Sequence, residues 1–248
     1  MKQNIYDDVD FFNKYEALRE EDKEKNANDL IEIPNFRKLV PDVKGKKILD
    51  LGCGYGENDF YYKKLGAKYV LGIDISKKMI EKANKNNKIE GIDYKVLPME
   101  DISSINSKFD IIISSLAFHY IEDFNKLIKD CYELLNDNGY LVFSQEHPMT
   151  TCIKYTENVK NGYTYIDDKY FGLYSDYNRP GKRTKEWFDK EVIKYHRNFE
   201  EIINTLINNG FVIEKILEPI PSENAIKNNP KYVNQYDRPF FLFVKVRK

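Results

Sequence analysis

Short apolar runs alternate with amphipathic segments along the central part of the chain. Five runs that are rich in β-branched or aromatic residues predict strands, at residues 46–52, 69–75, 93–99, 109–116 and 139–147. The segments between them carry apolar residues at three- and four-residue spacing, as amphipathic helices do. In the segment 124–138, Phe124, Leu127, Ile128 and Cys131 share one helical face. Strands that alternate with helices predict a mostly parallel sheet that helices cover on both faces.

The two ends of the chain depart from this alternation. Residues 211–220 and 238–248 are long strand-like runs with no clear helix between them, and a helical pattern precedes them. They are predicted to be neighbouring strands joined by a loop, with the last strand antiparallel to the rest. An irregular segment, 148–195, follows the fifth strand, and a helical arm, 1–45, precedes the first. The pattern predicts one α/β domain over the whole chain.

Composition limits the classes of partner. The chain has 248 residues, of which 42% are hydrophobic, and this suffices for one sizeable core. Lys and Arg total 39 and Asp and Glu total 40, so the net charge of -1 gives no general attraction to nucleic acid or to an anionic membrane. The acidic N-terminal stretch lacks the apolar core of a signal peptide, and no run approaches the ~20 apolar residues of a membrane-spanning helix. The three cysteines, Cys53, Cys131 and Cys152, are odd in number and widely spaced, which favours reduced thiols in a cytoplasmic protein.

The first predicted strand runs directly into glycines at alternate positions, Gly52, Gly54 and Gly56. In an open α/β sheet the ligand binds beyond the carboxyl ends of the strands, so this turn belongs to a ligand site. The spacing differs from the G-x-G-x-x-G of dinucleotide sites, and two carboxylates, Asp50 and Glu57, flank the turn. They would repel a pyrophosphate and attract an ammonium group. A ligand with an amino-acid head and a nucleoside tail, such as S-adenosylmethionine, fits both features.

Several stretches together extend this interpretation to a family. ILDLGCGYGEND, VLGIDIS, LPMED, FDIIISSLAFHYI and LLNDNGYLVFSQEHP, in this order, resemble the class I S-adenosylmethionine-dependent methyltransferases. The resemblance covers the five parallel strands and the closing strand pair. It implies a doubly wound, Rossmann-like, seven-stranded sheet with an antiparallel last strand. FSQEHP, YHRNFEEIINTLINNGF and RPFFLFVKVRK also resemble a bacterial subgroup of unknown substrate. Asn58 and Asp59 depart from the pattern, because many relatives have an apolar or small residue there.

The resemblance also assigns a part to each segment. The arm is followed by a cofactor-binding core over 46–147, a lid or substrate insertion over 148–195, and a C-terminal helix with the antiparallel strand pair over 196–248. Its implied cofactor contacts are Asp50, Gly52, Cys53 and Gly54 at the methionine part, Asp74 at the ribose, Met79, Met99, Glu100 and Asp101 around the adenine, and Ser115 and Leu116 beside the sulfonium, with Ile75 as a further contact.

Each of these positions also has a structural alternative. Asp74 would otherwise be a helix cap, Asp50 a buried charge that supports the loop, and Met79 a core residue. For Glu100 and Asp101 the alternative is a solvated turn. In the arm, Tyr15 and Arg19 lie one helical turn apart. Arg19 would pair with the cofactor carboxylate or else belong to a solvated helix face.

Histidines and aromatic residues are the candidates for the substrate side. A sulfonium is already a good leaving group, so the protein must place the nucleophile in line, exclude water and sometimes supply a base. His147, at the end of the fifth strand, and His119, after the fourth, are the candidate catalytic residues, although a lone histidine is structural by default. His196 precedes a helix and is a candidate cap residue. The aromatic-rich segment 151–195 would stack on a planar or apolar substrate or form a small core of its own.

The sequence therefore predicts a cytoplasmic enzyme that methylates a small molecule at an oxygen or nitrogen by in-line displacement, with S-adenosylhomocysteine as product. It predicts no metal, nucleic-acid or membrane partner, and a monomer or homodimer. A nicotinamide oxidoreductase would share the sheet and Asp74, but not the glycine spacing or the antiparallel ending. A nucleic-acid or protein methyltransferase remains an alternative, although SSLAFHY stands where amino-methylating enzymes of nucleic acids carry an Asn- or Asp-Pro-Pro-aromatic motif. A cofactor-binding module without catalysis is the third alternative.

Overall fold

The computed structural model describes residues 2–21, 25–156, 159 and 162–248. Residues 1 and 22–24 of the predicted arm lie outside the described residues, as do 157–158 and 160–161 of the predicted insertion.

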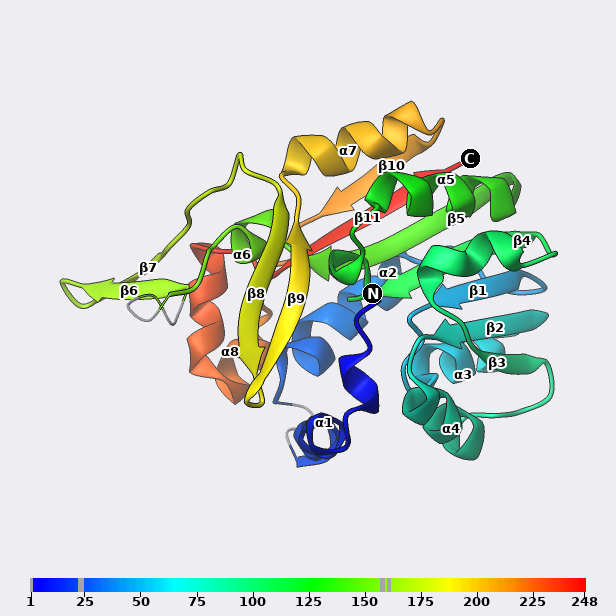
Figure 1. Ribbon diagram of the computed structural model, residues 1–248, viewed down its shortest axis with the longest axis horizontal. Coiled ribbons are helices and arrows are strands. Elements are labelled where there is room, and N and C mark those ends of the chain that lie inside the picture. The colour runs from blue at the N-terminus through cyan, green and yellow to red at the C-terminus, as the bar shows by residue number, and fades with distance from the viewer. Residues whose placement is uncertain (1, 22–24, 157–158, 160–161) are drawn as a thin grey trace.

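A seven-stranded sheet organises the molecule (Figure 1). Its strands are β1 (Lys47–Leu51), β2 (Tyr69–Asp74), β3 (Ile92–Val96), β4 (Phe109–Ser115), β5 (Leu135–Glu146), β10 (Val212–Leu217) and β11 (Phe241–Arg247). The strand order is β10-β11-β5-β4-β1-β2-β3. The pairs among β1 to β5 are parallel, whereas β11 is antiparallel to both of its neighbours. This confirms the predicted Rossmann-like fold with an antiparallel last strand.

Helices cover both faces of the sheet, because consecutive strand residues point to opposite sides. Leu49 packs with α5 (Phe124–Leu134) and α7 (Phe199–Asn208) in one core cluster. Its neighbour Ile48 packs on the other face with α2 (Ile33–Leu39), α3 (Glu57–Lys64) and α8 (Glu223–Asn228). Helix α4 (Lys77–Asn86) follows β2, and the short helices η3 (Met99–Ser104) and η4 (Phe118–Tyr120) follow β3 and β4. The sheet is therefore doubly wound.

The N-terminal arm begins with the short helix η1 (Ile5–Asp7), followed by α1 (Val9–Glu21) and the π-helical turn η2 (Asn28–Glu32). Asp7 fastens η1 to the start of α4, because its carboxylate accepts hydrogen bonds from Ser76 Oγ (2.6 Å) and the Lys78 backbone N–H (3.2 Å). The arm therefore lies at the carboxyl ends of the strands, which is also the side of the glycine turn.

The described residues of the insertion after β5 include a short helix and four strands, which corrects the expectation of an irregular segment. After the short helix α6 (Pro148–Thr151) it forms two hairpins, β6 (Tyr163–Ile166) with β7 (Lys169–Gly172) and β8 (Gly181–Trp187) with β9 (Lys190–His196). Both turns have two left-handed residues, as tight type I′ hairpins require. The β6–β7 hairpin projects from the body, whereas the β8–β9 hairpin crosses beside the arm (Figure 1).

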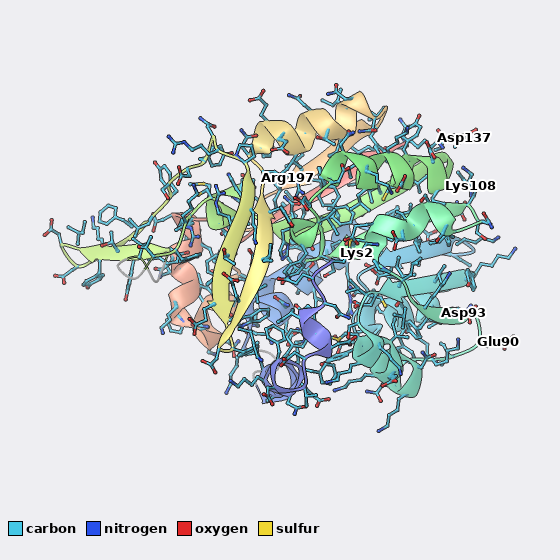
Figure 2. All side chains as sticks on the ribbon, viewed as in Figure 1. Lys2, Glu90, Asp93, Lys108, Asp137 and Arg197 are labelled. Atoms are coloured by element: carbon cyan, nitrogen blue, oxygen red, sulfur yellow. The ribbon has the colours of Figure 1, made fainter. Side chains whose placement is uncertain are left out.

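Aromatic contacts join the β8–β9 hairpin to the arm. The Phe11 ring lies 5.4 Å from the Trp187 ring, edge to face. At the other end of the hairpin, Arg197 lies between β9 and α7 (Figure 2), and its guanidinium donates to the carbonyls of Ile121 and Glu122. Both ends of this hairpin are therefore fixed by contacts with distant parts of the chain.

A second correction concerns the connection between β10 and β11, where no helix was predicted. Helix α8 and the short helix η5 (Pro230–Tyr236) lie there, and Ser222 caps α8 by accepting the Ala225 N–H at 3.2 Å. Within the part of the chain that the structure describes, no helix is both long and apolar enough to cross a membrane.

Candidate active site

A cavity of about 480 Å³ lies at the carboxyl ends of β1, β2, β4 and β5. Strand order reverses between β1 and β4, and this is the place where open α/β sheets bind their ligands. The sheet supplies one side of the cavity, and η1, α1, η2 and the β8–β9 hairpin supply the other. The arm and the insertion therefore enclose the ligand site of the sheet.

The glycine turn presents bare backbone to this cavity. Gly52 and Gly54 both line it and both have left-handed backbone, with φ of 77° and 54°. A Cβ at Gly52 would lie 2.7 Å from Ala117 Cβ, whereas a Cβ at Gly54 would meet no heavy atom within 4 Å. A side chain at Gly54 would therefore occupy the cavity itself. Cys53 also lines the cavity, and burial raises the pKa of its thiol well above the ordinary value.

Asp74, at the end of β2, connects the glycine turn to α4. Its Oδ2 accepts the Gly54 N–H at 3.0 Å, and its Oδ1 accepts the Ser76 N–H at 2.8 Å. Ser76 is itself the N-cap of α4, since its Oγ accepts the Met79 N–H, so that role does not need Asp74. Burial raises the pKa of Asp74 to about 6. Asp74 lines the cavity, and each of its oxygens has a second lone pair for a ligand.

A buried carboxylate from the arm, Glu32, is a site residue that the sequence analysis missed. Glu32 lines the cavity and is 1% exposed. Its Oε1 accepts hydrogen bonds from Ser115 Oγ at 2.9 Å and Ser144 Oγ at 2.5 Å, at the ends of β4 and β5. Burial raises the pKa of Glu32 to about 7. The sequence feature that could have indicated Glu32 is that it is the one charged residue in the apolar stretch LIEIPNF.

Strained backbone adjoins this carboxylate. Leu116 has φ of 53°, which is uncommon for a residue with a Cβ, and its N–H donates to Ser144 Oγ at 3.0 Å. Ser115 and Leu116 both line the cavity. Such strain persists where surrounding contacts determine the conformation, and it is concentrated at functional sites.

The predicted adenine contacts divide into two groups. Met79, Met99 and Glu100 line the cavity, as does Ile75 beside Asp74; Met79 is also almost fully buried, so it serves the core as well. Asp101 does not line it: its half-exposed carboxylate pairs with Lys2, whose position Figure 2 shows. The expectation for Asp101 is therefore corrected.

Tyr15 and Arg19 of α1 both line the cavity. The Arg19 guanidinium lies 2.9 Å from a Glu57 carboxylate oxygen and 3.3 Å from an Asp29 oxygen. Arg19 therefore bridges the arm and the first turn of α3, and is not part of a solvated helix face.

His119 is the one predicted catalytic histidine that lines the cavity. Its Nδ1 accepts the Glu146 backbone N–H at 3.3 Å, and burial lowers its pKa to about 3. The ring is therefore neutral with its proton on Nε2, which makes it a hydrogen-bond donor and not a base.

His147 does not line the cavity, and the expectation that it would is corrected. Its Nδ1 accepts the Met149 N–H at 3.1 Å and so caps α6, and its Nε2 lies 2.7 Å from Glu218 Oε1. Strand alternation turns the neighbouring Glu146 into the cavity instead. His196 is also structural, because it is buried between Thr151 Oγ1 and the Tyr177 carbonyl.

The wall contributed by the hairpin carries an ion pair. Lys194 Nζ lies 2.5 Å from Glu146 Oε1, and both residues line the cavity. Trp187 is the one aromatic residue of the described insertion that does so, so of the two alternatives for these aromatic residues, substrate stacking is open to Trp187 alone. The aromatic surface comes from Tyr6 and Tyr120 instead, whose hydroxyls are 3.5 Å apart. These residues were missed because they meet only through long-range packing.

Comparison with known proteins decides the family. Residues 49–143 match a family model described as a methyltransferase domain. An S-adenosylmethionine dependent methyltransferase of Mesorhizobium loti is 32% identical, with a TM-score of 0.79 over 90% of this chain and 98% of that one. A Listeria monocytogenes structure assigned to the same class is 34% identical, with a TM-score of 0.76 over 87% and 95% of the two chains. A Haemophilus influenzae protein of uncharacterized function is 39% identical over 100% of this chain and 98% of its own length. The chain is an S-adenosylmethionine-dependent methyltransferase.

The site of this methyltransferase fits the cofactor of its family. Gly54 leaves space that a side chain would fill, and Asp50 brings a buried carboxyl to the cavity wall. Asp50, Asp74 and Glu32 make this end of the cavity acidic, which suits a ligand that carries an ammonium and a sulfonium. Among the described side chains, no group of three or more His, Cys, Asp and Glu is placed to hold a metal ion.

Proposed function

We propose that this methyltransferase transfers a methyl group from S-adenosylmethionine to a small-molecule acceptor, which attacks through oxygen or nitrogen by in-line displacement. The observation that carries the proposal is the enclosure of the cavity by the arm and the β8–β9 hairpin, joined through Phe11 and Trp187. A cavity of about 480 Å³ is within the range of small-molecule sites. A polymer would have to pass its reactive atom between these two segments.

The cofactor is proposed to lie with its methionine part at the glycine turn and its ribose at Asp74. The other proposed contacts are Asp50 and Arg19 at the amino and carboxylate groups, Tyr15, Gly52, Cys53 and Gly54 beside the methionine chain, Ile75, Met79, Met99 and Glu100 around the adenine, and Ser115 and Leu116 at the sulfonium. When bound, the cofactor supplies the activated methyl group and becomes S-adenosylhomocysteine.

The chain's own residues are proposed to place the acceptor, exclude water and take up a proton. His119 donates a hydrogen bond from Nε2 to the acceptor, because its Nδ1 is engaged with the Glu146 N–H. Glu32 is the better proton acceptor, because its pKa of about 7 lies near neutrality whereas that of His119 is about 3. Tyr6, Tyr120 and Trp187 supply apolar surface for a planar acceptor.

The insertion 148–195 is proposed as a lid that closes one side of the site, with the arm closing the other. Both must open for exchange, so they belong to the less stable parts of the fold. The three free cysteines support a reducing cytoplasm as the location. The net charge of -1 and the carboxylates of the cavity disfavour a nucleic-acid acceptor.

Calorimetric titration with S-adenosylhomocysteine and with NAD tests the cofactor, and we expect binding of the first alone. Release of S-adenosylhomocysteine from S-adenosylmethionine is then measured over a panel of small phenols, carboxylates and amines, with tRNA and a protein mixture as comparison. Turnover on a small molecule supports the proposal. Turnover on the polymers alone would refute it, and cofactor binding with no turnover on any acceptor would favour the non-catalytic module.

A further inference from the structure

Asp59 is a fully buried acid that the proposed function does not use. It is the third residue of α3, at 0% exposure, and it occupies a position where the family resemblance leads to an apolar or small residue. Among the residues that the structure describes, no group donates a hydrogen bond to either Asp59 oxygen or to Asp50 Oδ1. Burying a carboxyl oxygen without a hydrogen-bond donor costs folding free energy. The unpaired oxygens of Asp50 and Asp59 therefore need an explanation.

The backbone places the two acids against each other. Asp50 on β1 is paired in register with Gly72 on β2. A Cβ built at Gly72 would collide with Asp59 Oδ2, so the missing side chain of Gly72 is what admits the Asp59 carboxyl. Because Asp50 and Gly72 are register partners on one face of the sheet and Asp59 Oδ2 lies against the Cβ position of Gly72, the two carboxyl groups are adjacent. Two ionised carboxylates have no donor between them, so such a contact requires a proton.

We propose that Asp59 is a positioning residue for the cofactor: it shares one proton with Asp50, so that the pair presents a single, oriented negative charge to the cofactor's ammonium group. This inference rests on the proposed function, which places the methionine part at Asp50. The shared proton pairs one oxygen of Asp59 with one oxygen of Asp50. The fixed hydrogen bond then holds the Asp50 carboxyl in one orientation at the cavity wall.

The pair couples cofactor binding to protons. Burial raises the pKa of Asp59 to about 7 and, together with Asp59, raises that of Asp50 well above the ordinary value. Below about pH 7 both acids are therefore protonated in the empty site. When the ammonium group binds there, one carboxyl O–H bond breaks and its proton leaves to the buffer. Affinity for the amino-acid head should therefore fall as pH decreases through about 7.

Other titratable groups surround the pair and bear on the experiment. They are Asp74 on β2, Tyr94 on β3, Tyr62 on α3, Glu32 on η2 and Cys53 in the glycine turn. Asp74 and Glu32, with pKa values of about 6 and about 7, also titrate in this range. The test therefore compares an Asp59 variant with the wild type, because the variant leaves both of these groups in place.

The experiment measures binding of S-adenosylhomocysteine by calorimetry at pH 6 and pH 8, in two buffers of different ionisation enthalpy. In the wild type the pair contributes up to about a tenfold loss of affinity at pH 6, with proton release on binding. In Asp59→Asn the amide donates permanently to Asp50, so this tenfold component and the matching proton release should disappear. The matched control is Asp130→Asn, which removes another buried acid that pairs with Lys126 at 2.5 Å on α5, outside the cavity. It should keep the wild-type pH profile.

An infrared measurement on the empty protein tests the shared proton directly. At pH 8.5 the wild type should show the carbonyl stretch of a protonated carboxylic acid, and Asp59→Asn should lack it. Absence of this band in the wild type, or an unchanged pH profile in Asp59→Asn, would overturn the proposal. Should Asp59→Asn fail to fold by circular dichroism, the wild-type band decides alone. If the wild-type protein shows the band but does not bind S-adenosylhomocysteine, the proposed function is refuted, and with it the role of the pair.

Discussion

Replacing Glu32 with glutamine should make the stability of the empty protein less dependent on pH. Glu32 is 1% exposed, and its Oε1 accepts hydroxyl hydrogen bonds from Ser115 and Ser144. Glutamine keeps an acceptor oxygen for both hydroxyls and cannot ionise. The variant therefore isolates the free energy of holding a charge at this position, with the packing of η2 against β4 and β5 retained.

The sign and size follow from proton linkage. Burial raises the pKa of Glu32 from 4.5 to about 7, so the folded state prefers the neutral acid. That stability is fully present below the unfolded-state pKa of 4.5 and is lost as pH rises through about 7. At 1.36 kcal/mol for each pH unit the whole difference is about 3 kcal/mol, and roughly 2.5 kcal/mol of it falls between pH 5 and pH 8. Glu32→Gln should therefore gain about 2.5 kcal/mol relative to wild type over this interval.

Urea unfolding followed by circular dichroism at the two pH values measures this gain, provided that the slope with urea is the same for both proteins. Glu146→Gln is the control, because it makes the same substitution in the same cavity. Burial alone would raise the pKa of Glu146, but the Lys194 ammonium and His119 lower it to about 2. The ionised Glu146 carboxylate stabilises the fold, and this stabilisation is lost only as the pH falls toward a pKa of about 2. Glu146→Gln should therefore be destabilised about equally at pH 5 and pH 8. An equal effect of Glu32→Gln at both pH values would refute the buried-charge argument.

Three further predictions concern the cofactor and the lid. Gly54→Ala and Gly45→Ala both place a Cβ at positive φ in open space, so each should cost about 1 kcal/mol of stability. Only Gly54→Ala should weaken S-adenosylhomocysteine binding, at least tenfold. Equal binding by both variants would show that the glycine turn is not part of the cofactor site. Asp74→Ala should weaken S-adenosylhomocysteine binding by roughly 2 to 4 kcal/mol through the loss of two hydrogen bonds to the ribose. Wild-type affinity should also fall below about pH 6, where Asp74 takes up a proton. Wild-type affinity in the Asp74→Ala variant would contradict the placement of the ribose at Asp74. Trp187→Ala should speed amide hydrogen exchange in residues 181–196, and S-adenosylhomocysteine should slow that exchange in the wild type. Equal protection of the wild type with and without the ligand would mean that the β8–β9 hairpin is a structural element and not a lid.

The sheet and the glycine turn were predictable because their signals are local. A buried strand and a glycine turn follow one another within ten residues, and the next strand ends at Asp74. Nothing distant has to be known to place these parts on one edge of a parallel sheet. The hairpin turns were also readable in principle: Asp167-Asp168 supplies two residues that tolerate left-handed backbone.

The acceptor side was less predictable because long-range packing determines it. Alternation along β5 correctly implied that Glu146 and His147 point apart, but it did not say which one faces the cavity. Tyr6 reaches Tyr120 across 114 positions of the chain, and Glu32 reaches Ser144 across 112. The pattern of a single segment does not reveal such long-range contacts, so His147 was predicted to face the cavity that Glu146 lines instead.

The raised pKa values of the cavity acids have one physical origin, and it supports the proposal that a cationic cofactor binds here. Glu32, Asp50 and Asp74 are all buried where ionisation is unfavourable, so in the empty protein each carboxylate opposes folding near neutral pH. A ligand that brings an ammonium and a sulfonium supplies the positive charge that these groups lack. In the proposed complex, binding therefore reduces the free-energy cost of ionising these buried acids. The proposed closure by the arm and the β8–β9 hairpin would strengthen the same interactions by excluding water, so cofactor affinity and enclosure of the site would reinforce each other.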